Sequence, residues 1–200
     1  MQYEEEPQNN YVRLTGMVQN LAKDKDNTVF TLCVNRLSGM DDKIPVKVHH
    51  DLDVNLSERM QVTVEGIFTS FNEIVGDRSK LILNVHAFEI VPAIDSDHFN
   101  PNTINLTGFI CKQPIYRTTP FNREITDLLV AVNRTANKSD YIPAIAWGRN
   151  ARFAKSLLVG EKVQIIGRVQ SREYQKRFAD DTVEIRTAYE VSINEIDRAE

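Results

Sequence analysis

Aromatic and basic side chains that can hold a single nucleic-acid strand gather in the second half of this 200-residue sequence. Single strands are bound by a cationic groove that follows the phosphates and by aromatic rings on which the bases stack. Tyr141 and Trp147, the only tryptophan, begin and end one predicted strand at positions of the same parity, so both rings are expected on one face of a sheet. The candidate binding residues are Trp147, Tyr141, Tyr174, Phe178, Arg117, Arg123, Arg134, Arg149, Arg168, Arg172, Lys176 and Arg177.

Each of these side chains also has an ordinary structural interpretation. A tryptophan at the end of a strand is often a core residue, a tyrosine at the start of one often packs half-buried, and scattered arginines often form only a solvated face. Binding is favoured because the rings and the cations fall on the same strands and on one predicted loop. Arg168, Arg172 and Tyr174, for example, occupy positions of the same parity on a single strand.

The charge of the sequence differs between its two halves. The whole chain has a formal net charge of −4, which on its own argues against a nucleic-acid partner. Residues 1–97 contain 9 basic and 16 acidic residues, whereas residues 98–200 contain 15 basic and 12 acidic residues. The first half is therefore acidic, with a net charge of −7, and the second half is basic, with +3. This asymmetry predicts different roles for the two halves.

An internal repeat divides the chain. Four short motifs of the first half recur in the same order in the second half, at an offset that grows from 92 to 98 to 101 residues as the loops lengthen. We therefore predict a tandem duplication with domains at 1–92 and 102–200. The segment between them, 93–101, is polar and bracketed by prolines, which is typical of a solvated linker. The matching motifs are Leu14-Thr15-Gly16 with Leu106-Thr107-Gly108, Val34-Asn35-Arg36 with Val132-Asn133-Arg134, Ile44-Pro45 with Ile142-Pro143, and Gly66 with Gly167.

Each copy is predicted to contain five strands, from alternating apolar residues rich in β-branched side chains. In the second copy, apolar residues recur with helical spacing across 149–158 and Gly160 follows as a stop signal, which predicts one short helix between strands three and four. The matching slot of the first copy, 51–59, lacks this periodicity. Three strands, a helix and two strands in about 100 residues are the order of the OB fold, so we predict an all-β protein of tandem five-stranded OB barrels. The strands are expected near 11–19, 28–36, 43–49, 60–71 and 79–90, and near 103–111, 124–134, 140–147, 162–174 and 182–194.

Several classes of protein and site are not expected. Cys33 and Cys111 lie in apolar runs, as buried free thiols do, and no cysteine or histidine has a partner at metal-ligand spacing. We assign His98 and the aspartates near it to the linker. No phosphate-binding glycine loop or catalytic motif occurs, so we expect neither enzymatic activity nor a cofactor. No run approaches the roughly 20 apolar residues that cross a bilayer, and the acidic N-terminus is unlike a signal peptide, so we expect an intracellular protein.

The ordered motifs of the second half resemble those of the bacterial single-stranded-DNA-binding protein (SSB) family, over about residues 103–195. The resemblance implies an OB fold that binds single-stranded DNA, and it places Tyr141, Trp147 and Tyr174 at the family's base-stacking positions. It likewise places Arg117, Arg149 and Arg172 at the family's phosphate-facing positions. The motifs are NLTG at 105–108, QPIYRTTP at 113–120, VAVNR at 130–134, YIP at 141–143, WG at 147–148 and QSREY at 170–174.

The resemblance also carries expectations about biology and assembly. It implies sequence-tolerant binding in replication, recombination or repair, in the bacterial cytoplasm at the nucleoid, with RNA as an alternative ligand. Family members carry one barrel per subunit and assemble as tetramers, so two barrels per chain predict a homodimer that presents four barrels, or a pair of chains in which the first copy supplies only contacts. The family usually ends in a disordered tail with an acidic tip that recruits other proteins. The sequence ends directly after the last predicted strand, so tail-dependent recruitment is not expected.

The first copy resembles the family only weakly. At the positions of Tyr141, Trp147 and Tyr174 it has Lys43 or Asp42, Lys47 or Val48, and Glu73. An acidic domain repels phosphate backbones, so we predict that this copy serves assembly and not binding. The second hypothesis for the whole chain is an accessory protein of a primosome or mobile element that uses OB barrels mainly to hold other proteins.

Overall fold

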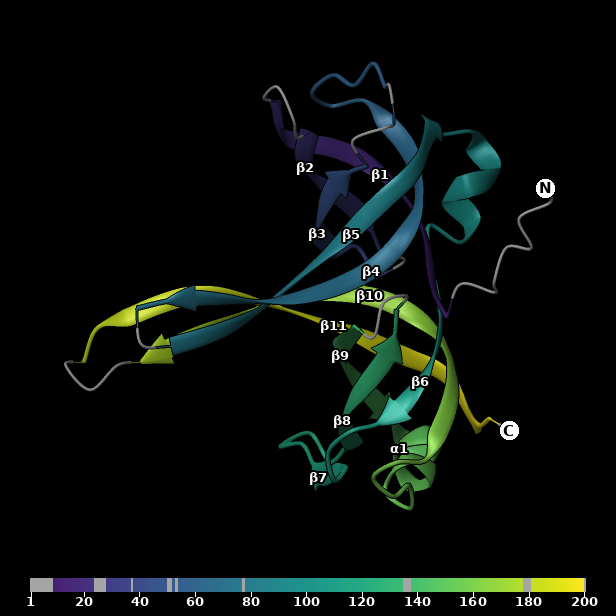
Figure 1. The fold of residues 1–200 in the computed structure, drawn as a ribbon, viewed down its shortest axis with the longest axis vertical. Coiled ribbons are helices and arrows are strands. Elements are labelled where there is room, and N and C mark those ends of the chain that lie inside the picture. Colours follow the sequence, from purple (N-terminus) through teal and green to yellow (C-terminus); the bar gives the residue numbers. More distant parts are fainter. Residues whose placement is uncertain are drawn as a thin grey trace.

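Two barrels, one from each half of the chain, make up the structure (Figure 1). The computed structural model describes residues 9–23, 28–36, 38–49, 52, 54–76, 78–134, 138–177 and 181–199. The first barrel contains β1 (Asn10–Lys23), β2 (Thr28–Asn35), β3 (Asp41–Val48), β4 (Gln61–Val75) and β5 (Arg78–Pro92). A 3-10 helix, η1 (Asp95–Phe99), follows it. The second barrel contains β6 (Asn102–Ile110), β7 (Ile115–Thr118), β8 (Glu124–Asn133), β9 (Ser139–Trp147), α1 (Gly148–Ala154), β10 (Lys162–Arg177) and β11 (Val183–Arg198).

Each half closes into a five-stranded barrel. In the first, β1 pairs with both β2 and β4, and the ring is completed by β2–β3, β3–β5 and β5–β4. In the second, β6 pairs with both β8 and β10, and the ring is completed by β8–β9, β9–β11 and β11–β10. Among the strands that the structure describes, β3–β5 and β9–β11 are the parallel pairs. The predicted fold class, tandem OB barrels with a helix between strands three and four of the second, is confirmed.

The helix of the second barrel and the chain before β8 differ from the sequence prediction. The helix α1 ends at Ala154, earlier than expected, because the chain turns there to bury Leu157 completely and then passes through Gly160 at a φ of 92°. A short additional strand, β7, pairs with β8 and forms a hairpin beside the barrel. In the first barrel, the described residues between β3 and β4 contain no helix, as their lack of periodicity indicated.

The repeated glycines Gly66 and Gly167 mark the same irregularity in both barrels. Each follows a shift in register between the two longest strands of its barrel. A Cβ atom on Gly66 would lie 2.4 Å from the carbonyl oxygen of His86, and one on Gly167 would lie 2.4 Å from that of Ser192. Because only glycine tolerates this backbone approach, the motif recurs in both copies. Beyond the bulges, β4–β5 and β10–β11 continue as two long hairpins that project side by side (Figure 1).

The two barrels share one continuous sheet. Strand β1 pairs antiparallel with β6 from Asn10 opposite Leu106 to Leu14 opposite Asn102, with Val12 opposite Ile104 at the centre. Since residues of β6 correspond to residues of β1 at an offset of 92, each strand meets its own repeat. The barrels are therefore related by an approximate twofold axis through this pairing.

A buried aspartate of the first barrel holds the second barrel. The carboxylate of Asp42, which is fully buried, accepts a hydrogen bond from the backbone N–H of Ser171 at 2.7 Å. Arg36 donates to the same carboxylate at 2.7 and 2.5 Å and to the carbonyl oxygen of Ser171 at 3.2 Å. The backbone N–H of Lys43 donates to Ser171 Oγ at 2.9 Å. We call Asp42, Arg36 and Ser171 the Asp42 site.

The same arrangement occurs with the barrels exchanged. The carboxylate of Asp140, 1% exposed, accepts from the backbone N–H of Ser70 at 2.5 Å and pairs with Arg134 at 2.8 Å. The backbone N–H of Tyr141 donates to Ser70 Oγ at 2.7 Å. Burial raises the pKa of Asp140 above its ordinary value, and the bonds from Ser70 and the charge of Arg134 oppose that rise. We call Asp140, Arg134 and Ser70 the Asp140 site, and the two sites together form the junction.

The connecting segment, expected to be a solvated linker, is held against the first barrel. Asp97 in η1 accepts hydrogen bonds from Arg13 at 2.8 Å, from Thr63 at 2.8 Å and from the backbone N–H of Ile94 at 3.1 Å. These partners give the segment a fixed position that its local sequence does not reveal.

Replacing Asp97 by asparagine is expected to remove a pH-dependent part of the stability. The hydrogen bond from Arg13 lowers the pKa of Asp97 to about 2, from an ordinary value of 3.8. A carboxylate with a lowered pKa stabilises the fold above its ordinary pKa, and this contribution disappears as the pH falls towards 2. Asp97→Asn should therefore lower the free energy of unfolding at pH 7, and the difference from the wild type should shrink as the pH falls below 3.8 and disappear only below pH 2. Urea unfolding across this range measures the difference, and a gap independent of pH would contradict the assignment.

Candidate nucleic-acid interface

Strand β9 presents two aromatic rings on the outside of the second barrel. Its side chains alternate, with Ile142, Ala144 and Ala146 in the core and Tyr141 and Trp147 facing out. Tyr141 is 42% exposed and Trp147 is 38% exposed. Neither ring is a core residue, and both lie on the face that their shared parity predicted.

The indole of Trp147 is held in place without being covered. Its Nε1–H donates a hydrogen bond to Ser192 Oγ on β11 at 3.2 Å. Ser192 is buried, while more than a third of the tryptophan surface remains accessible. A ring fixed at its edge with an open surface offers a base a stacking platform with little conformational freedom to lose.

The hairpin of β10 and β11 carries a third ring and several cations. Tyr174 is 38% exposed, and the guanidinium of Arg172 lies 5.9 Å from its ring centre. Lys176 and Arg177 continue β10 towards the tip of the hairpin, where Lys176 contributes to lowering the pKa of Glu184 after the larger effect of Arg186. Phe178 lies outside the described residues.

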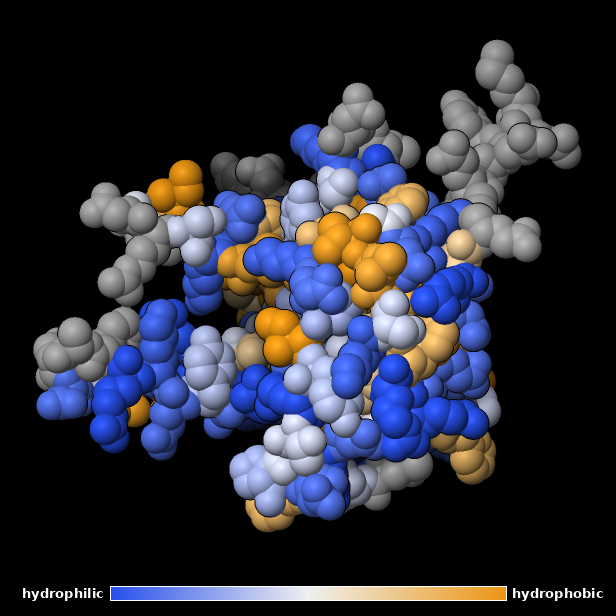
Figure 2. Space-filling model, turned by 90° about the horizontal axis from the view of Figure 1, so that it is seen from below, coloured by the Kyte–Doolittle hydropathy of each residue, from blue (hydrophilic) through white to orange (hydrophobic). Residues whose placement is uncertain are grey.

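The remaining candidate arginines are spread over the second barrel. Arg117 on β7 pairs with Asp127 at 2.8 Å, with both side chains more than a third exposed, and Arg123 is exposed in the turn between β7 and β8. Arg149 on α1 lines a hollow of about 300 Å³ with Phe153 and the end of β11. Figure 2, a view of the lower end of the molecule, shows a mostly hydrophilic surface with small separate hydrophobic patches.

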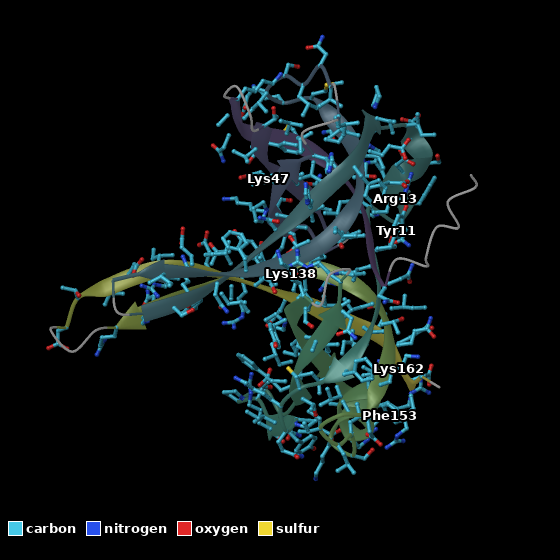
Figure 3. The ribbon with its side chains drawn as sticks, viewed as in Figure 1. Tyr11, Arg13, Lys47, Lys138, Phe153 and Lys162 are labelled. Atoms are coloured by element: carbon cyan, nitrogen blue, oxygen red, sulfur yellow. The ribbon has the colours of Figure 1, made fainter. Side chains whose placement is uncertain are left out.

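Arg134 and Arg168 lie at the junction of the two barrels. Arg134 is paired with Asp140, so its charge is already balanced by a buried carboxylate. Arg168 lies 3.7 Å from the carboxylate of Asp42 and donates to Gln170 Oε1 at 3.2 Å. The sequence grouped both with the strand-binding residues, and the structure gives Arg134 a structural role between the barrels. In Figure 3, Lys138 lies beside this junction, whereas Phe153 and Lys162 lie at the far end of the second barrel.

The geometry of the second barrel agrees with the comparison with known proteins. The model of the single-strand binding protein family matches residues 101–199, which include the whole of the second barrel. The second half of the chain belongs to the single-strand binding protein family. Within the described residues, no group of three or more His, Cys, Asp or Glu side chains is placed to hold a metal ion, and no helix is long and apolar enough to cross a membrane.

Individual members of the single-strand binding protein family show the same similarity. The single-stranded DNA-binding protein of Clostridium tetani is 31% identical over 83 residues, which are 38% of this chain and 57% of that protein. The single-stranded DNA-binding protein 1 of Staphylococcus aureus is 32% identical over 83 residues, 38% of this chain and 50% of that protein. The chain spans about half the length of these curated relatives.

The fold of the whole chain is also shared with a solved structure of the family. The wild-type single-stranded DNA binding protein from Thermus aquaticus superimposes with a TM-score of 0.68, over 96% of this chain and 93% of that chain, at 20% identity. A deletion mutant of the same protein gives a TM-score of 0.69 at 20% identity, over 95% of this chain and 94% of that chain. Both barrels therefore have counterparts in that fold.

The two aspartates that organise the junction were not among the residues predicted from the sequence. Asp42 and Asp140 each precede a repeated Ile-Pro by two residues, so the motif Asp-x-Ile-Pro occurs once in each copy. Comparing the copies at this position would have singled out both residues. Their partners, Ser171 and Ser70, come from the opposite barrel and match each other at the offset of 101 residues that relates Gly66 to Gly167.

Proposed function

We propose that this chain binds single-stranded DNA with little sequence preference and without catalysis, in replication, recombination or repair at the bacterial nucleoid. The observation that carries the proposal is the outward placement of Tyr141 and Trp147 on one face of a barrel that belongs to the single-strand binding protein family. Bases of any sequence stack on such rings because every base has a π face. RNA is the alternative ligand, since the same stacking accepts it.

Basic side chains around these rings would follow the phosphates. Arg172 and Tyr174 extend the surface along β10, and Arg117, although paired with Asp127, is exposed enough to exchange that partner for a phosphate. Surface ion pairs of this kind are worth at most about 1 kcal/mol, so the exchange costs little. The further members of the proposed surface are Arg123, Arg149, Arg168, Lys176, Arg177 and Phe178.

We assign the first barrel to assembly. It presents no ring at the positions of Tyr141 and Trp147, and its half of the sequence has a net charge of −7. We propose that two chains associate and present four barrels. Sedimentation equilibrium measures this, and the mass of a single chain, 22.9 kDa, would contradict it.

Titration with dT oligomers tests the function directly. Because Trp147 is the only tryptophan, its fluorescence reports on this site alone, and stacking of a base should quench it. Affinity should fall as salt rises, with a slope of log K against log[salt] of about 0.7 for each phosphate contacted. Absence of both quenching and salt dependence would reject the proposal. Poly(rU) in the same assay compares RNA with DNA.

A further inference from the structure

A pocket with no assigned role lies where the two barrels meet the connecting segment. Its volume is about 280 Å³. Arg36 comes from the residue directly after β2, Phe99 and Asn100 come from the connecting segment, and Arg168 comes from β10 of the second barrel. Both barrels and the segment between them therefore build this pocket.

The pocket has one cation more than its buried carboxylate balances. Arg36 makes two short hydrogen bonds to Asp42, whereas Arg168 lies 3.7 Å away from the same carboxylate. Burial and the charge of Arg36 lower the pKa of Arg168, and the more distant Asp42 only partly opposes them. Asp42, and after it the more distant charge of Glu190, raise the pKa of Arg36. Glu190 itself accepts a hydrogen bond from Gln170 at 2.7 Å and is not among the residues that line the pocket.

The Asp140 site shows whether a second arginine is needed to join the barrels. There, one arginine and one aspartate hold the opposite barrel through Ser70. At the offset of 101 residues that relates Gly66 to Gly167, the counterpart of Arg168 is Ile67. The junction is therefore maintained by one arginine per aspartate, and Arg168 is not needed to join the barrels.

An exposed ring stands at the rim of the same pocket. Phe99 is 85% exposed, which is unusual for a phenylalanine whose backbone is held in place. It ends η1, which Asp97 fixes to Arg13 and Thr63. An arginine and an exposed ring in the lining of one pocket are the two kinds of group that a nucleotide in a single strand requires.

The pocket continues the surface that carries Trp147. Arg168 lies directly opposite Ser192 in the pairing of β10 with β11, so the two side chains share one face of the hairpin, where Ser192 is buried. Ser192 in turn accepts the hydrogen bond from the indole of Trp147 and pairs with Ile145 of β9. One strand, β11, thus separates the stacking platform from Arg168.

We propose that this pocket binds one phosphate of the single strand between Arg168 and Arg36, with the adjoining base on Phe99. A single DNA strand bound in this way would run from the face of Trp147 towards the connecting segment and the first barrel. The inference rests on the proposed function, and its ligand is a nucleotide within a polynucleotide and not a free anion.

Two variants of the full chain test the pocket. Phe99→Ala removes an exposed ring, and Arg168→Gln removes the second cation while Arg36 and Asp42 keep their pair. With a dT oligomer long enough to pass Trp147, Phe99→Ala should weaken binding at least about fivefold. Arg168→Gln should lower the salt slope by about 0.7, the value of one phosphate. An oligomer containing 5-iodouracil should crosslink to Phe99 on irradiation, as peptide mapping would detect.

The controls are residues of the same type at sites remote from the pocket. Phe71→Ala removes a ring that is 49% exposed on β4 of the first barrel, and Arg198→Gln removes a surface cation paired with Glu161. Thermal unfolding establishes that all four variants fold. If the wild type binds with quenching of Trp147 but the pocket variants behave as these controls do, the inference is overturned and the function stands.

Two other outcomes would overturn the assignment of the pocket. If the wild type neither binds nor shows quenching, the proposed function fails and the pocket assignment falls with it. If inorganic phosphate alone, at constant ionic strength, blocks crosslinking at Phe99 in the micromolar range, the pocket is a free-anion site and the polynucleotide assignment is overturned.

Discussion

Trp147→Ala is expected to weaken the binding of dT oligomers by about 5- to 150-fold. This range corresponds to the roughly 1–3 kcal/mol that one base stacked on an aromatic ring contributes to binding. The loss is expected to be large because the indole is fixed by Ser192 while 38% of its surface remains open. Trp147→Phe should keep part of the affinity, since it keeps a ring but loses the hydrogen bond. Because both variants lack the fluorophore, fluorescence anisotropy of a labelled oligomer is the measurement.

The matched control for Trp147→Ala lies on the first barrel. Phe71 on β4 is 49% exposed, more than Trp147, but belongs to the acidic half of the chain. Phe71→Ala should change the affinity little if the second barrel carries the binding surface. Equal losses at Trp147 and Phe71 would show that both barrels bind the strand, and an unchanged affinity of Trp147→Ala would refute the stacking platform.

Asp42→Ala lowers the free energy of unfolding by about 3–5 kcal/mol, the cost typical of removing one partner from a buried ion pair. The Asp42 carboxylate is fully buried, and its loss leaves the Arg36 guanidinium and the backbone N–H of Ser171 without their acceptor. The effect should therefore reach both barrels. Urea unfolding of the full chain measures it, and Asp42→Asn should recover part of the loss by accepting from Ser171.

The exposed ion pair of Arg117 and Asp127 is the control for Asp42→Ala. Asp127 accepts from Arg117 at 2.8 Å, but its side chain is 38% exposed and that of Arg117 is 53% exposed. Asp127→Ala should cost at most about 1 kcal/mol, because water replaces the lost partner and screens the charge. Similar costs for Asp42→Ala and Asp127→Ala would show that the junction does not depend on the buried carboxylate.

The two barrels could be predicted from the sequence because the patterns that specify their strands are local. The alternation of apolar and polar residues along β9 indicates which of its side chains face inward. The repeated Gly66 and Gly167 indicate where a strand bends. The outward placement of Tyr141 and Trp147 followed from parity alone. This much of the fold and of the candidate site needed no knowledge of distant contacts.

The junction and the fixed connecting segment were hidden because their partners are far apart along the chain. Asp97 and Arg13 are separated by 84 positions, and Asp42 and Ser171 by 129. A polar segment with prolines has the same composition whether it is solvated or pinned by one carboxylate. The long hairpins were also underestimated, since β4 and β10 run to Val75 and Arg177, where exposed residues no longer alternate with apolar ones.

The pairing of β1 with β6 has a consequence for how the protein resists aggregation. A strand whose backbone N–H and C=O groups face solvent is a template for another chain to add to. Here each repeat covers that edge of its neighbour over five paired residues, from Asn10–Leu106 to Leu14–Asn102. Two separate barrels would lose this cover on dilution, whereas barrels on one chain meet at an effective concentration that dilution does not change. Duplication within one polypeptide thus keeps a vulnerable edge shielded even when the protein is scarce.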